Sequence, residues 1–89
     1  MNAKEKKRVV AIADLLESSA AAFEHTLEEL ATMQQEEQER FDALGDKAQE
    51  GERGQKLASA ADALQSAADH AQEAFDGLNE ASSDLRGIE

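Results

Sequence analysis

Residues 9–44 read VVAIADLLESSAAAFEHTLEELATMQQEEQERFDAL, and apolar residues recur in them at alternating spacings of four and three. One row at seven-residue intervals contains Val9, Leu16, Phe23, Leu30, Glu37 and Leu44. A second row, displaced by four residues, contains Ala13, Ala20, Leu27, Gln34 and Phe41. A seam sustained over this many heptads is typical of a long helix that packs against another helix.

The partner helix is predicted within the same chain. Its two rows contain Leu57, Leu64, Ala71, Leu78 and Leu85, and Ala61, Ala68, Phe75 and Ser82. One antiparallel register places Leu44 opposite Leu57 and Leu16 opposite Leu85, so that both seams match along their whole length. We therefore predict an all-α fold, a coiled-coil-like antiparallel two-helix hairpin. The alternative is one continuous helix in an intermolecular coiled coil, which requires the glycines of residues 45–55 to be helical.

The turn is predicted at residues 45–55, GDKAQEGERGQ, which contain three glycines and charges of both signs. The first helix then covers residues 4–44 and the second covers residues 56–87, within a single domain of residues 1–89. We expect Gly45 to cap the end of the first helix and Gly87 to end the second. An alternative continues the first helix through Ala48, which fits the seam, and tightens the turn to residues 51–54.

The chain has 89 residues, a net charge of −11 and no Cys. Disulfides, thiolate nucleophiles and cysteine-type zinc sites are therefore excluded. The acidic balance disfavours direct binding to nucleic acids and anionic membranes, which are themselves polyanionic, and favours basic partners. No apolar run approaches the length of about 18 residues that spans a bilayer. The start resembles a signal peptide only superficially, because Asp14 interrupts a short apolar region; we expect a cytoplasmic protein.

Negative charge dominates the shafts of both predicted helices. Residues 9–39 contain eight acids and no base, and residues 57–85 contain six acids and no base. On this acidic shaft the candidate partner-binding residues are Glu24, Glu28, Asp62, Asp69, Glu73, Asp76 and Glu80. Two interpretations remain open. The shaft serves solubility, for example in a high-salt cytoplasm, or it imitates a polyanion and occupies a basic groove meant for DNA or RNA.

Apolar residues outside the seam predict a further interface. Val10, Ile12 and Leu15 stand outside the seam at the start of the first helix, so this end is expected to pack against a second chain or a partner. In the second helix, an alanine row that includes Ala67 and Ala74 would let another helix approach closely. These five residues are our candidates for partner binding or dimerisation. We expect a homodimer that forms a four-helix bundle.

Patterns with catalytic or metal-binding chemistry are sparse. His25 and His70 each begin a His-x-x-Glu tetrad, completed by Glu28 and Glu73. Carboxylate-bridged metal sites in helical bundles use related spacings that project into the core, but the heptad places both histidines outside the seam. We predict no catalytic residue, no metal and no cofactor, and we expect no enzymatic activity.

Gln34 and Glu37 interrupt the apolar seam of the first helix by one turn. A polar layer of this kind usually specifies register or oligomeric state. The alternative is that Glu37 is a carboxylate with a raised pKa that acts as an acid, a base or a ligand. We favour the structural interpretation, because Leu64 is predicted to face Glu37 across the seam.

Two groups of proteins are similar to this chain in outline. The helical hairpins secreted by the type VII system resemble it in size and shape, but their Trp-x-Gly turn motif is replaced here by Ala43-Leu44-Gly45. Small acidic proteins of phages and mobile elements that inhibit defence enzymes are similar in size and charge, and several imitate DNA. Neither resemblance assigns a family.

We expect a non-enzymatic, acidic protein–protein interaction module, an adaptor or regulator, whose partner presents a basic or apolar groove. The alternative is an inhibitor that mimics nucleic-acid charge and blocks the basic groove of a DNA- or RNA-binding protein.

Overall fold

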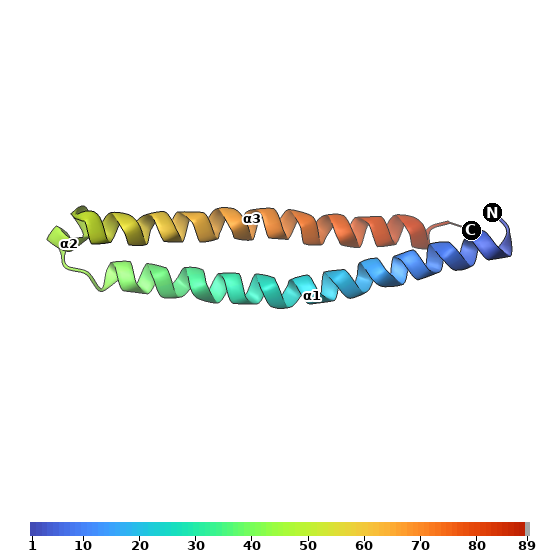
Figure 1. Ribbon diagram of the computed structural model, residues 1–89, viewed down its shortest axis with the longest axis horizontal. Coiled ribbons are helices and arrows are strands. Elements are labelled where there is room, and N and C mark those ends of the chain that lie inside the picture. The colour runs from blue at the N-terminus through green and yellow to red at the C-terminus, as the bar shows by residue number, and fades with distance from the viewer. Residues whose placement is uncertain (89) are drawn as a thin grey trace. The chain divides into compact units, whose positions relative to one another are not determined.

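The computed structural model describes residues 1–88 and contains a long pair of α-helices joined through a short one (Figure 1). The helices are α1 (Ala3–Asp42), α2 (Asp46–Glu50) and α3 (Glu52–Arg86). Residues 1–88 contain no strand. Among them, no helix has the combined length and hydrophobicity needed to cross a membrane.

Contacts divide the chain into two compact units. The first unit contains residues 1–26 and 71–88, and the second contains residues 27–70. In the first unit the beginning of α1, blue in Figure 1, lies beside the end of α3, which is orange to red. In the second unit the end of α1 lies beside the beginning of α3, with α2 between them in the sequence.

The rows predicted from the heptad spacing are the rows that the fold buries. Every α1 residue that is buried or half-buried belongs to the predicted seam, and every other α1 residue is exposed. All nine predicted seam residues of α3 are likewise buried or half-buried. Burial is shallow, because a seam side chain has a helix on one side and solvent on the other. Within residues 1–88, Ala13 and Ala20 are the only buried hydrophobic side chains, and no large side chain is fully buried.

The predicted turn is mostly helical, which corrects the boundaries. Helix α1 ends at Asp42, α2 occupies five residues of the expected turn, and α3 begins at Glu52 rather than at residue 56. Gly45 does not cap the end of α1. It is the N-cap of α2, with φ −68° and ψ 162°, and its carbonyl accepts the Gln49 N–H at 3.0 Å. Residues 47–50, KAQE, are good helix formers, and Asp46 in the first turn suits the positive end of the helix dipole.

Gln49 of α2 caps the end of α1 from outside that helix. Its side-chain amide donates to the Leu44 carbonyl at 3.1 Å and to the Phe41 carbonyl at 3.3 Å. The last carbonyls of a helix have no partner within the helix. The glutamine therefore supplies the role that sequence reasoning gave to Gly45. The other predicted terminator is confirmed: α3 ends at Arg86, and the Gly87 N–H donates to the Ser83 carbonyl at 3.0 Å.

The start of α1 is capped by Asn2. The Glu5 N–H donates to Asn2 Oδ1 at 2.8 Å, and Asn2 Nδ2 donates to Glu5 Oε1 at 3.4 Å. Such reciprocal bonds satisfy a free N–H of the first turn. They also place a carboxylate at the positive end of the helix dipole, where Lys4, Lys6, Lys7 and Arg8 bring unfavourable positive charge.

Gly54 marks the closest approach of α3 to α2. A Cβ added there would lie 2.5 Å from the Ala48 carbonyl oxygen and still closer to that of Gln49. We expect Gly54→Ala to lower the free energy of unfolding by about 1–3 kcal/mol, because the backbone must move to relieve the clash. Gly77→Ala is the matched control, because its Cβ meets no atom within 4 Å. It should raise stability by about 0.5–1 kcal/mol. Urea denaturation followed by circular dichroism measures the free energy of unfolding of both variants. Equal changes in the two variants would contradict the close approach of α3 to α2 at Gly54.

Candidate interaction surfaces

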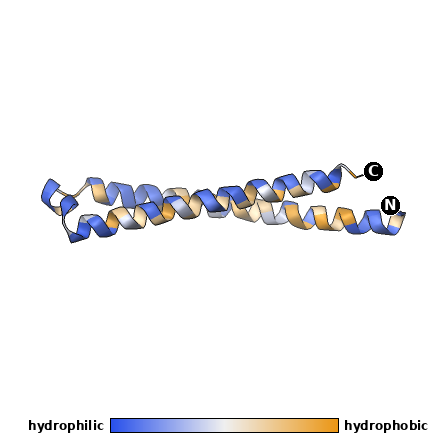
Figure 2. Ribbon diagram, turned by 90° about the horizontal axis from the view of Figure 1, so that it is seen from above, coloured by the Kyte–Doolittle hydropathy of each residue, from blue (hydrophilic) through white to orange (hydrophobic). Residues whose placement is uncertain are grey.

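Exposed apolar side chains gather in the first turns of α1. Val10, Ile12 and Leu15 are 48%, 49% and 68% exposed, and Figure 2 shows hydrophobic residues concentrated in this part of the helix. We call these three residues the apolar end. Their exposure agrees with their predicted place outside the seam. Residues 1–88 leave six large apolar side chains exposed, and three of these six lie within two turns of α1. Such a concentration is the usual mark of an interaction site.

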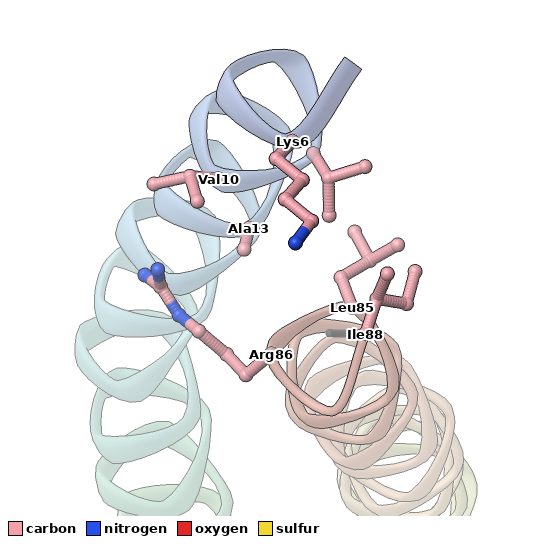
Figure 3. Close-up of a pocket in the computed structure, with 7 residues that line it drawn as sticks. Lys6, Val10, Ala13, Leu85, Arg86 and Ile88 are labelled. Atoms are coloured by element: carbon pink, nitrogen blue, oxygen red, sulfur yellow. The ribbon is translucent and has the colours of Figure 1, made fainter. Parts of the chain in front are cut away.

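A small hollow lies beside the apolar end, within the first unit (Figure 3). Its volume is about 170 Å³, and it is lined by Lys6, Val9, Val10, Ala13, Leu85, Arg86 and Ile88. Aliphatic side chains form most of its wall, and Lys6 directs its ammonium group toward the space between the helices. Small-molecule sites are usually about 300 Å³ or larger. The hollow therefore matches one aliphatic side chain of a partner better than a free ligand.

Arg86 connects the two helices of the first unit on one side. Its guanidinium donates to Asp14 Oδ1 at 2.6 Å and to both carboxylate oxygens of Glu17, at 2.9 and 3.1 Å. The hydrogen bonds from Arg86, helped by its positive charge, hold the pKa of Glu17 below its ordinary value, against the opposing effects of desolvation and of the Asp14 charge. Sequence reasoning did not single out Arg86. The heptad register could have identified it, because Arg86 and Glu17 occupy equivalent positions beside the seam.

The Arg86 contact predicts a pH effect. The pKa of Glu17 is lower in the folded chain, so the stabilisation is complete above the ordinary value of 4.5. It is lost as the pH falls through the folded-state pKa. In Arg86→Gln, the pKa of Glu17 should rise toward the ordinary value, as measured by side-chain carboxyl chemical shifts during an NMR titration. Arg40→Gln, in the second unit, is the control and should leave the Glu17 titration unchanged. A Glu17 pKa that is the same with and without Arg86 would contradict the contact.

All seven predicted acidic-shaft residues are exposed. Glu24, Glu73, Asp76 and Glu80 belong to the first unit, and Glu28, Asp62 and Asp69 to the second. Within residues 1–88, none of the seven forms a salt bridge; the carboxylates that do are Asp14, Glu17, Glu37 and Glu52. The shaft therefore keeps its negative charge.

Glutamines, rather than bases, bind several of the carboxylates. Gln65 donates to Asp69 at 2.8 Å and Gln72 donates to Asp76 at 3.0 Å. Gln38 donates to Asp42 at 3.0 Å and Gln35 donates to Glu39 at 3.2 Å. Each glutamine lies four residues before its acid, a spacing that stabilises helices. A neutral amide supplies this hydrogen bond without cancelling the charge, a pattern that sequence reasoning did not identify.

The two polar residues of the α1 seam, Gln34 and Glu37, both have polar partners nearby. Gln34 donates to Gln65 of α3, and Glu37 forms an ion pair with Arg40 of its own helix. The Glu37 side chain is only 18% exposed, so a charged partner within reach lowers the cost of its position in the seam. The prediction that Leu64 faces this carboxylate overlooked Arg40, one turn further along.

The remaining candidates lie apart from one another. His25 and His70 are both exposed, as are Ala67 and Ala74, whereas Ala60 and Ala81 of the same alanine row are half-buried. Across residues 1–88, no three His, Asp or Glu side chains come together in a group that could hold a metal ion.

No protein-family model, no curated protein and no solved structure matches this chain.

Proposed function

We propose that this chain is a non-enzymatic protein–protein interaction module that acts as a helical hairpin and pairs with a second copy in a four-helix bundle. It binds a protein partner through the apolar end. The observation that carries the proposal is the exposure of Val10, Ile12 and Leu15 in a chain that buries so little apolar surface. Two-helix packing leaves one side of each helix uncovered, so further burial has to come from another molecule.

The hollow indicates what such a partner presents. Its aliphatic wall suits a single apolar side chain, and Lys6 at its edge suits a neighbouring carboxylate or carbonyl oxygen on the partner. We assign no catalytic role, because general acid–base chemistry requires a carboxylate positioned against an enclosed substrate. The shaft carboxylates instead lie in the open on helix surfaces.

Replacing Val10 tests partner binding through the apolar end. Tagged protein should capture its partner from source-cell lysate in high salt as well as low salt, because burial of apolar surface is little weakened by screening. Val10→Glu should weaken this binding at least about tenfold, since it brings a charge into an apolar contact. Ala11→Glu is the matched control: it makes the same change one residue away, at an exposed site outside the apolar end. Equal capture by the two variants would overturn this use of the apolar end.

A second candidate function is an inhibitor that mimics nucleic-acid charge. The observation that favours it is the set of glutamine-to-carboxylate hydrogen bonds, which support the acids without neutralising them. A surface built only for solubility gains more from opposite charges at the same helical spacing. A basic groove that normally holds DNA or RNA would then bind the shaft.

Charge reversal tests this second function. Binding through the shaft should weaken steeply with salt and be competed by added DNA. Combined substitution of Asp62, Asp69 and Asp76 by Lys should abolish capture of the nucleic-acid-binding partner. The control replaces Glu29, Glu36 and Asp84 by Lys, which changes the net charge equally at other exposed positions. If both triple variants lose binding equally, the loss is caused by the change in net charge. The surface formed by Asp62, Asp69 and Asp76 is then not the binding surface.

A further inference from the structure

The Arg86 contact establishes which helix rows share a face in the first unit. Arg86 binds Glu17, so the rows beside the seam that contain these residues lie on the same side. We call this side the acidic face; its rows are Val10, Glu17 and Glu24 in α1, and Gln72, Asn79 and Arg86 in α3. The rows on the other side of each seam must then share the opposite face.

Where α1 and α3 lie level, the opposite face carries no charge; Glu5 continues its α1 row beyond the level of the end of α3. Its rows are Ile12, Ser19 and Thr26 in α1, and Ala74, Ala81 and Ile88 at and beyond the end of α3; we call it the neutral face. Ile12 and Ile88 are 49% and 40% exposed. The Thr26 hydroxyl donates to the Ala22 carbonyl at 3.5 Å within its own helix, so covering this face leaves that group satisfied. Asp14 and Asp76 lie one position outside the acidic face, and Asp84 lies one position outside the neutral face.

The side chains of the neutral face form matched levels. The helices run in opposite directions within this unit (Figure 1). The register fixed by Arg86 with Asp14 and Glu17 therefore places Ile12 level with Ile88. Ser19 then lies level with Ala81, and Thr26 with Ala74. Two levels consist of small side chains, which allow a further helix to approach to about 8 Å between axes.

The exposed area is larger than a folded monomer of this mass requires. A monomer of 9.6 kDa exposes about 5,100 Å² by the general scaling of surface with mass. This chain exposes 6468 Å², which is about 1,400 Å² more. A standard interface covers about 800 Å² on each partner. The excess is thus large enough to supply one such interface.

We infer that a second copy of this chain covers the neutral face, with the neutral faces of the two copies packed against each other. The inference rests on the proposed pairing of two copies and names the surface they use. Each copy carries a net charge of −11, so contact through the acidic faces opposes itself. Contact through the neutral faces turns those charges outward. The arrangement is isologous, with α1 of one copy over α3 of the other, so it closes at two copies.

This arrangement divides the apolar end between two uses. Ile12 lies on the neutral face and is covered by the second copy. Val10 lies on the acidic face and lines the hollow, so it stays available to a different protein. Ile88 lines the hollow as well, so the second copy would border the hollow on that side. A dimer would then present two copies of the hollow, one in each chain.

Adjacent serines of α1 provide the test. Ser19 is on the neutral face, and Ser18 is on the outer side of the same helix; both are exposed. The full chain should elute with about twice the 9.6 kDa mass of one chain in light scattering at tens of micromolar. Ser19→Glu should raise the dimer dissociation constant at least about tenfold, because two glutamates would face an apolar interface. Ser18→Glu should leave it unchanged, and Ala74→Glu should reproduce the Ser19→Glu effect from α3. Circular dichroism should show equal helix content in all variants.

The possible outcomes distinguish failure of the proposed surface from failure of the proposed pairing of two copies. A monomeric wild-type chain would overturn both the proposed pairing and this surface. A wild-type dimer that persists in Ser19→Glu and Ala74→Glu would overturn the neutral face while leaving the pairing intact. Binding of a different protein that requires Ser19 and competes with self-association would show that a partner, rather than a second copy, occupies this face.

Discussion

The structure depends on one seam between two helices. Each seam side chain packs against the facing helix and meets solvent on its flanks, so the seam residues are half-buried rather than enclosed. Along the seam, burial is deepest where a small residue lets the helices approach, at Ala13, Ala20 and Ser82. The Ser82 hydroxyl donates to the Asn79 carbonyl at 3.0 Å, so its burial leaves no polar atom unsatisfied. Each seam residue therefore contributes little hydrophobic free energy to folding. The contacts at the helix ends and beside the seam account for a correspondingly larger share of the stability.

Those ends and flanks are held by polar side chains. Asn2 caps the start of α1, and Gln49 binds the carbonyls at its end. Arg86 links the end of α3 to α1 on one side of the seam. Each of these contacts is partly exposed and individually modest. Their common effect is to fix where the helices end and how they are aligned, which an apolar seam made largely of Ala and Leu specifies weakly.

Charge is sorted between faces rather than spread evenly. In the first unit, Glu17 and Glu24 occupy the side that Arg86 bridges, while the level rows of the opposite side consist of Ile, Ala, Ser and Thr. Glu73 and Glu80 lie on the outer side of α3. Glutamines support several acids without neutralising them. Self-repulsion along the acidic side therefore persists and favours contact through the other side. A strongly acidic chain can in this way keep one surface for self-association and another for a basic or apolar partner.

Helical character and the two seam rows were determined by the sequence alone, because heptad spacing is a local property that any long helix converts into a face. The exposure of Val10, Ile12 and Leu15 followed from the same spacing. The tertiary structure decided the α2 helix, the N-cap role of Gly45, the cap from Gln49 and the tight place of Gly54. These features depend on how the ends of two helices meet. It also decided which flanking rows share a face, because heptad positions leave both sides of a seam equivalent until a contact such as Arg86 with Glu17 distinguishes them.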